Sequence, residues 1–137
     1  MKPFAIKTRA KRPAPKPRSE TSIQIDIVDY LRKVLPPSAI VHHSKNEGNR
    51  GGRKGLMDGV RAKKMGVAAG FPDIAVYASG KRVLFLEVKN KTGRPTRTQQ
   101  FMWQRLRILG FDCGLVRSID EARNALKACG IETREAE

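Results

Sequence analysis

The sequence has little cysteine and no long apolar run. Its two cysteines, Cys113 and Cys129, have neither a CxxC partner nor a histidine at the spacing of zinc ligands. Adjacent His42 and His43 would point to opposite faces of a strand and could not chelate one ion together. No apolar run approaches the roughly 20 residues that cross a bilayer, and none follows the basic N-terminus as in a secretory signal. These absences argue against a zinc site and a membrane span, and they favour a reduced, cytoplasmic protein.

Acidic residues are also scarce. Asp and Glu total 13 against 28 Lys and Arg, so the 137 residues carry a net charge of +15 at pH 7. A chain of this length has room for one domain with a single core. The charge predicts an anionic partner, either nucleic acid or an anionic membrane surface, although a merely soluble charged surface is the alternative.

The N-terminal segment is especially basic. Residues 1–18 contain seven Lys or Arg, four Pro and no acid, so we expect a disordered basic arm. Such an arm attracts phosphates without sequence specificity, or it serves only as a solubilising tail. We expect the folded domain over 19–130 and a C-terminal tail over 131–137.

Hydrophobic periodicity predicts an α/β domain over 19–130. The expected helices are 21–35, a short one over 57–64, 96–109 and one that begins at a capping box on Ser118 and ends at Gly130. The expected strands are 39–44, 73–78, 82–90 and 111–117, with a basic loop over 45–56. This order predicts an αβββαβ core, in which a mixed central sheet is flanked by helices.

A predicted hairpin brings three charged side chains together at one end of the sheet. On a strand, Glu87 and Lys89 share one face, while the apolar residues between 84 and 88 pack mainly on the other. If Gly80 is the centre of the turn, Asp73 lies opposite Glu87, with β-carbons about 4.5–5.5 Å apart. Like charges in such a pair destabilise a sheet, and they suit a hard divalent cation such as Mg²⁺. The alternative is a surface salt bridge between Glu87 and Lys89, worth about 0–1 kcal/mol.

Pro72-Asp73 followed by Glu87-Val88-Lys89 resembles the motif of the PD-(D/E)XK nucleases, and within them the chain is similar to the VRR-NUC family as a stand-alone module. The similarity extends from about Glu20 to Ala125. The motifs that carry it are Gly70-Phe71-Pro72-Asp73, Leu84-Phe85-Leu86-Glu87-Val88-Lys89, Gly93 through Thr96 leading to Gln99, then Trp103, Leu106, Gly110 and Val116-Arg117-Ser118. Thr96 and Arg97 stand where the family often has Ser and Pro.

The resemblance implies a restriction-endonuclease-like fold and a metal-dependent endodeoxyribonuclease that hydrolyses phosphodiester bonds in DNA. It implies Mg²⁺ or Mn²⁺ held by Asp73, Glu87 and the backbone carbonyl of Val88, with Lys89 positioning water or offsetting charge on the phosphate. It also implies a preference for branched or junction DNA, as in repair and recombination, and is compatible with a homodimer. The alternative is a nucleic-acid-binding module that keeps the fold without catalysis.

Two further residues are candidates for the site. Gln99 lies on the inward stripe of helix 96–109, where its amide needs partners such as lysine, water or carboxylate; the alternative is a hydrogen-bonded core glutamine. Glu20, by the resemblance, is the carboxylate of the first helix and a metal or water ligand. Alternatively, Thr21 and Gln24 form a capping box, and Glu20 only interacts favourably with the helix dipole.

A cluster of basic residues lies between the first two strands. It is the expected surface for tracking phosphates, although a solvated loop would have a similar composition. Its members are Arg50, Arg53, Lys54, Arg61, Lys63 and Lys64.

Overall fold

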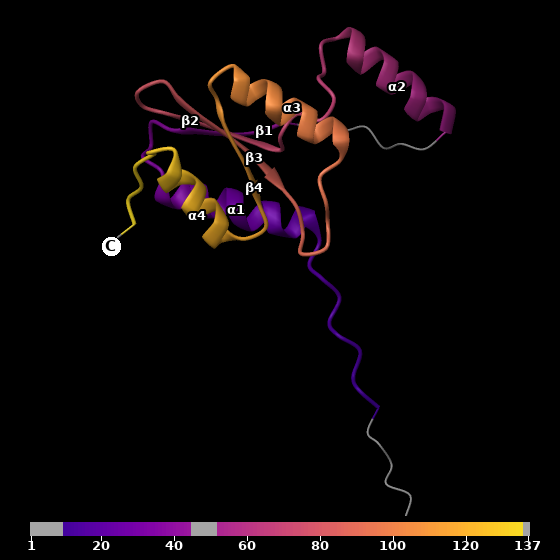
Figure 1. Ribbon diagram of the computed structural model, residues 1–137, viewed down its shortest axis with the longest axis horizontal. Helices are drawn as coiled ribbons and strands as arrows, with labels where there is room; N and C mark the ends of the chain where they lie inside the picture. Colours follow the sequence, from indigo (N-terminus) through magenta and orange to yellow (C-terminus); the bar gives the residue numbers. More distant parts are fainter. Residues whose placement is uncertain (1–9, 45–51, 136–137) are drawn as a thin grey trace, which may run out of the picture.

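The computed structural model describes residues 10–44 and 52–135, with 52–57 described by their backbone alone (Figure 1). The elements follow the predicted order and confirm the αβββαβ core. They are α1 Glu20–Val34, β1 Ile40–His43, α2 Gly52–Lys64, β2 Ile74–Ala78, β3 Arg82–Val88, α3 Arg97–Ile108, β4 Asp112–Val116 and α4 Ile119–Ala128.

The four strands of the described chain form one mixed sheet in the order β1-β2-β3-β4. The first three strands run antiparallel, and β4 runs parallel to β3 because α3 provides the crossover between them. In the hairpin, Ala75 pairs with Phe85 and Ile74 with Leu86. This is the register predicted from a turn centred on Gly80, so the start of β2 and the end of β3 lie side by side.

Helices cover both faces of this sheet. Figure 1 shows α1 and α4 on one face and α3 on the other. Alternate strand residues, among them Leu84, Leu86 and Val88, form the main core beneath α1 and α4, as the alternation predicted. Phe85 lies on the opposite face, where it packs edge-on against Phe71. The two-residue period of β3 therefore separates an apolar face from a face that ends in Glu87.

Two predicted features of the helices are wrong. The N-cap of α1 is Ser19, whose hydroxyl accepts from the Ser22 backbone at 3.1 Å, so Thr21 lies inside the helix and forms no capping box with Gln24. A helix over 96–109 would place Leu109 on the inward stripe with Trp103 and Leu106, but α3 ends at Ile108, and Leu109, its C-cap, is 72% exposed. The cap of α4 is Ser118, as predicted, and it accepts from the Glu121 backbone at 3.2 Å.

The segment expected as a loop over 45–56 is partly helical, since α2 begins at Gly52. The glycines of this stretch, Gly51, Gly52 and Gly55, lower its helix propensity, so the sequence predicts a later helix start than the structure has. Figure 1 shows α2 standing away from the sheet. None of the described helices is long and apolar enough to cross a membrane.

The two ends of the described chain differ. Residues 10–18 are exposed and have no regular structure, and in Figure 1 they run away from the start of α1. At the other end, Ile131 is buried, and the Glu135 carboxylate accepts from the Tyr30 hydroxyl at 2.9 Å. The described part of the C-terminal segment therefore lies against α1.

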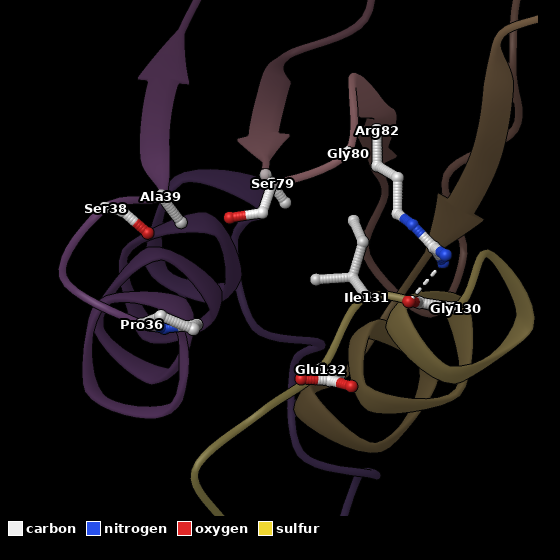
Figure 2. Close-up of a pocket in the computed structure, with 10 residues that line it drawn as sticks. Pro36, Ser38, Ala39, Ser79, Gly80, Arg82, Gly130, Ile131 and Glu132 are labelled. Carbon is white, nitrogen blue, oxygen red and sulfur yellow. Dashed lines mark hydrogen bonds between the residues drawn. The ribbon is translucent and has the colours of Figure 1, made fainter.

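The turn between β2 and β3 lies at the opposite end of the sheet from Asp73 and Glu87. There the guanidinium of Arg82 donates to the carbonyl oxygens of Cys129, at 3.1 Å, and Gly130. Figure 2 shows this contact beside a cavity of about 300 Å³, lined also by Pro36, Ile131 and Glu132. The contact ties the hairpin turn to the end of α4.

Gly70 controls how closely the loop before β2 approaches α3. It has a φ of +75°, and a β-carbon there would lie 2.6 Å from the carbonyl oxygen of Thr98 and 2.9 Å from the nitrogen of Gln99. We expect Gly70→Ala to lower the free energy of unfolding by more than the roughly 1–2 kcal/mol of the left-handed conformation alone. Urea unfolding measures the change.

The matched control is Gly59→Ala. Gly59 lies in α2 with nothing within 4 Å of an added β-carbon, so alanine should raise stability by up to about 1 kcal/mol. Equal stability of the two variants would contradict the close approach at Gly70.

Candidate active site

The structure places Asp73 and Glu87 at the same end of the hairpin, as the register predicted. Glu87 is the penultimate residue of β3 and is 1% exposed. Asp73 precedes β2, and its Oδ2 accepts from the backbone N–H of Val88 at 2.8 Å. The Asp73 carbonyl oxygen accepts from the Ser44 backbone, also at 2.8 Å. Backbone groups from β3 and from the end of β1 therefore fix Asp73 beside Glu87.

The two oxygens of Glu87 have different surroundings. Oε1 accepts from Nε2 of Gln99 at 2.7 Å and lies 3.5 Å from Nζ of Lys89. Oε2 is buried and has no hydrogen-bond partner within the described residues. A buried carboxylate oxygen without a donor is unfavourable. This oxygen is therefore the position at which Glu87 can hold either a proton or a cation.

Gln99 serves both the site and the helix that carries it. Its Oε1 accepts from the backbone N–H of Thr96 at 2.9 Å, and the Thr96 hydroxyl accepts from the Gln99 backbone at 3.2 Å. This capping box fixes the side-chain oxygen at the start of α3. The amide nitrogen then points to Glu87, which is the inward carboxylate partner expected for this glutamine.

Lys89 lies between two carboxylates. Its Nζ is 3.5 Å from Oε1 of Glu87 and 3.9 Å from Oε1 of Glu20, and its side chain is 10% exposed. Glu20 is the first residue of α1, and its side chain is 45% exposed. The structure thus brings Glu20 to the predicted site, and the cap that would have made Gln24 structural is absent because Ser19 caps α1.

Burial and the neighbouring charge of Asp73 raise the pKa of Glu87 to about 8. The Lys89 ammonium opposes this shift but does not overcome it. In the metal-free protein, Glu87 therefore holds a proton at neutral pH. A cation bound between the two carboxylates would displace that proton.

The oxygen donors of this site fit a hard cation. Asp73 and Glu87 supply carboxylates, and the carbonyl of Val88 projects to the same edge of β3 as the N–H that meets Asp73. No cluster of three or more His, Cys, Asp and Glu suited to a metal is found in the part of the chain that the structure describes. Mg²⁺ is commonly held by only one or two carboxylates together with water and substrate oxygens. Two carboxylates and a carbonyl match that type of site.

The contacts of two residues near the site are not predicted from the sequence. Nδ1 of His43 lies 2.9 Å from the carbonyl oxygen of Asp73 and 2.8 Å from Nε2 of Gln24, although His43 was interpreted as an ordinary strand residue. Arg117 donates to the carbonyls of Asn90 and Gly93, the latter at 2.7 Å. Both contacts join residues far apart in sequence, so no local pattern indicates them.

The described members of the predicted basic cluster lie away from the carboxylates. Arg61, Lys63 and Lys64 are exposed on α2, which stands away from the sheet. Arg50 lies outside the described residues, and the side chains of Arg53 and Lys54 are not described. Their contact with nucleic acid stays a prediction.

Solved structures share this fold, among them the following two. One is a VRR_NUC domain protein with a TM-score of 0.67 and 20% identity, covering 86% of this chain and 93% of that one. The other is a VRR_NUC domain with a TM-score of 0.51 and 18% identity, covering 79% and 94%. No family model matches the sequence, and no curated protein matches it closely enough to count. The fold is therefore that of a VRR_NUC domain, as the sequence resemblance predicted.

Glu87 should give the metal-free protein a distinctive pH dependence. In the folded state its pKa is about 8, whereas the unfolded chain loses this proton near the ordinary value of 4.5. The folded state binds more protons in this window, so the free energy of unfolding should fall as the pH rises through it. Glu87→Gln keeps an oxygen for Gln99 but removes the titration, and its stability should depend less on pH.

Urea unfolding in EDTA at about pH 5 and about pH 8 measures this difference. Parallel pH dependence of the wild type and Glu87→Gln would show that Glu87 is already ionised at neutral pH in the folded protein, which would contradict the electrostatics of this site.

Proposed function

We propose that this chain is a VRR-NUC nuclease that hydrolyses phosphodiester bonds in DNA with Mg²⁺ or Mn²⁺. One observation carries the proposal: Glu87, Asp73, Lys89 and Gln99 converge at one end of the hairpin, and a buried oxygen of Glu87 is left without a partner. The VRR_NUC fold independently supports a nuclease-type domain.

Asp73, Glu87 and the carbonyl of Val88 would hold the cation. When bound, it supplies Lewis-acid stabilisation of the phosphate and lowers the pKa of a water. The hydrogen bonds of the two carboxylates support this assignment. Asp73 is fixed by the Val88 N–H, and Gln99 donates to only one oxygen of Glu87 and leaves the other free.

Lys89 is positioned to act on the phosphate or on the attacking water. Glu87 and Glu20 flank its ammonium at 3.5 and 3.9 Å and hold it at the edge of the site, where 10% of the side chain is exposed. A fixed positive charge there stabilises negative charge that develops on the phosphate, or it orients the water through a hydrogen bond. Glu20 contributes by positioning this lysine and by accepting a hydrogen bond from water.

The net charge of +15 supports DNA as the polyanion that meets this site. A preference for branched DNA and a homodimeric state come from the sequence resemblance alone, and both stay predictions. A panel of duplex, flap and four-way-junction DNA compares the substrates directly.

Lys89→Ala should abolish cleavage while leaving DNA binding intact. We expect Mg²⁺- or Mn²⁺-dependent cleavage of the DNA panel to fall at least about 100-fold, since removal of a preorganised charge-stabilising group typically has this effect. Binding in EDTA should change only a few-fold, because DNA affinity depends on many phosphate contacts. Gel assays of cleavage and fluorescence anisotropy of binding give the two quantities.

The control is Lys127→Ala, which removes an equal charge from the last turn of α4. The end of α4 contacts the turn of the hairpin, at the opposite end of the sheet from Asp73 and Glu87. It should cleave like the wild type. Wild-type rates in Lys89→Ala would refute the mechanism, and a wild-type protein that binds DNA but cleaves none with either ion would instead be a non-catalytic binding module.

A further inference from the structure

The loop from 90 to 95 leads directly from the site to α3 and is held in one shape. The guanidinium of Arg117, at the end of β4, donates to the carbonyls of Asn90 and Gly93. The Asn90 side chain accepts from the backbone N–H of Gly93 at 2.6 Å. These contacts hold the loop between Asn90 and Gly93 against Arg117. The outward side chains of Lys91 and Arg94 take no part in them.

Three cations in and beside this loop have no carboxylate partner among the residues that the structure describes. Within the described residues, Lys91, Arg94 and Arg97 form no ion pair with a carboxylate, and all three are exposed. Arg97 begins α3, whose first turn contains no acid. Cations at the positive end of a helix are unfavourable, and a bound anion relieves this repulsion.

A groove of about 780 Å³ runs along this loop. Lys91, Thr92, Arg94, Gln100 and Arg117 are among the residues that line it. Gly93 also lines it, and a β-carbon on Gly93 would lie 2.8 Å from the Glu20 carboxylate and 3.5 Å from the Lys89 side chain. The groove therefore begins where the candidate active site ends.

The groove continues toward the N-terminal arm. Lys91 and Arg117 also line a second hollow of about 940 Å³, together with Lys16, Arg18, Asp26 and Asp120. Asp26 is paired with Arg18 at 2.6 Å and Asp120 with Arg123 at 2.5 Å, whereas Lys16 makes no ion pair within the described chain. A path thus leads from Lys89 past Lys91 to Lys16 in the arm, and both acids beside it are paired with arginines.

We propose that this path binds the DNA backbone on one side of the cleaved phosphodiester, with Lys91 and Arg94 contacting its phosphates. The inference rests on the proposed function, because it takes Lys89 and the carboxylates as the position of the cleaved bond. In this proposal the DNA strand next to the cleaved bond binds to the 90–95 loop, and not to the basic surface of α2. The hydrogen bonds from Arg117 to the loop carbonyls fix the loop, and they thereby fix the positions of Lys91 and Arg94 relative to the candidate active site.

Salt dependence of binding tests the path. In EDTA, with a duplex of about 20 base pairs, Lys91→Ala/Arg94→Ala should lower the slope of log affinity against log salt by about 1.8, or about 0.9 per phosphate contact. The advantage of the wild type over this variant should then shrink about tenfold between about 50 and about 200 mM salt. Both side chains are exposed and without ion-pair partners in the described chain, so the melting temperature should stay unchanged.

Two matched variants remove the same charge elsewhere. Arg32→Ala/Lys127→Ala changes exposed residues in the last turns of α1 and α4, and its salt slope should stay within experimental error of the wild type. Arg61→Ala/Lys64→Ala tests the surface of α2. A reduced slope in the α2 variant together with a wild-type slope in Lys91→Ala/Arg94→Ala would overturn the proposed path.

The proposal that the loop binds DNA on only one side of the cleaved bond requires a second test. It uses substrates that are shortened on one side of that bond or on the other. Trimming the side that meets the loop should lower kcat/KM of the wild type to that of Lys91→Ala/Arg94→Ala, whereas trimming the other side should lower both alike. Equal sensitivity on both sides would refute the one-sided path. If the protein cleaves no DNA, the proposed function fails, and the salt slopes measured in EDTA still decide whether the groove binds DNA.

Discussion

Glu87 is buried beside Asp73. The contacts of the side chains and backbone groups at this end of the hairpin depend on how the protein accommodates these two carboxylates. Burial and the like charge raise the pKa of Glu87 to about 8, so the metal-free fold keeps a proton there that a solvent-exposed glutamate would lose. Three groups limit the destabilisation: the Val88 N–H binds Asp73, the Gln99 amide binds one oxygen of Glu87, and the Lys89 ammonium lies close by. The remaining oxygen has no hydrogen-bond partner among the described residues, so it is the position for this proton or for a cation that replaces it.

Each compensating group comes from a different element, and the fold brings them together. The antiparallel hairpin sets Asp73 against the end of β3, and the parallel pairing of β4 places Arg117 beneath the loop that follows Lys89. The same crossover brings the start of α3, and with it Gln99, over Glu87. Local stability is thus given up at one end of the sheet, while apolar packing under α1 and α4 stabilises the rest.

Features set by local periodicity could be predicted from the sequence. The hairpin register followed from alternation and one turn glycine, and it placed Asp73 near Glu87 correctly. Helix ends were harder, because Ser19 and Thr21 are both competent caps and only the packing of α1 selects between them. The contacts of His43 and of Arg117 depend on tertiary structure and carry no local signal. Gln99 was expected to face inward, but its role in the helix cap was missed.

The central claim is that Asp73 and Glu87 form a cation site, and thermal unfolding with and without Mn²⁺ tests it most directly. The wild type should gain stability with the ion, by about 2.7 kcal/mol at one hundred times its Kd. Asp73→Asn keeps an oxygen for the Val88 N–H and removes the charge that helps to raise the pKa of Glu87, so in EDTA at neutral pH it should be at least as stable as the wild type. It should gain nothing from Mn²⁺. A variant that is less stable in EDTA, with no response to Mn²⁺ in either protein, would contradict the account.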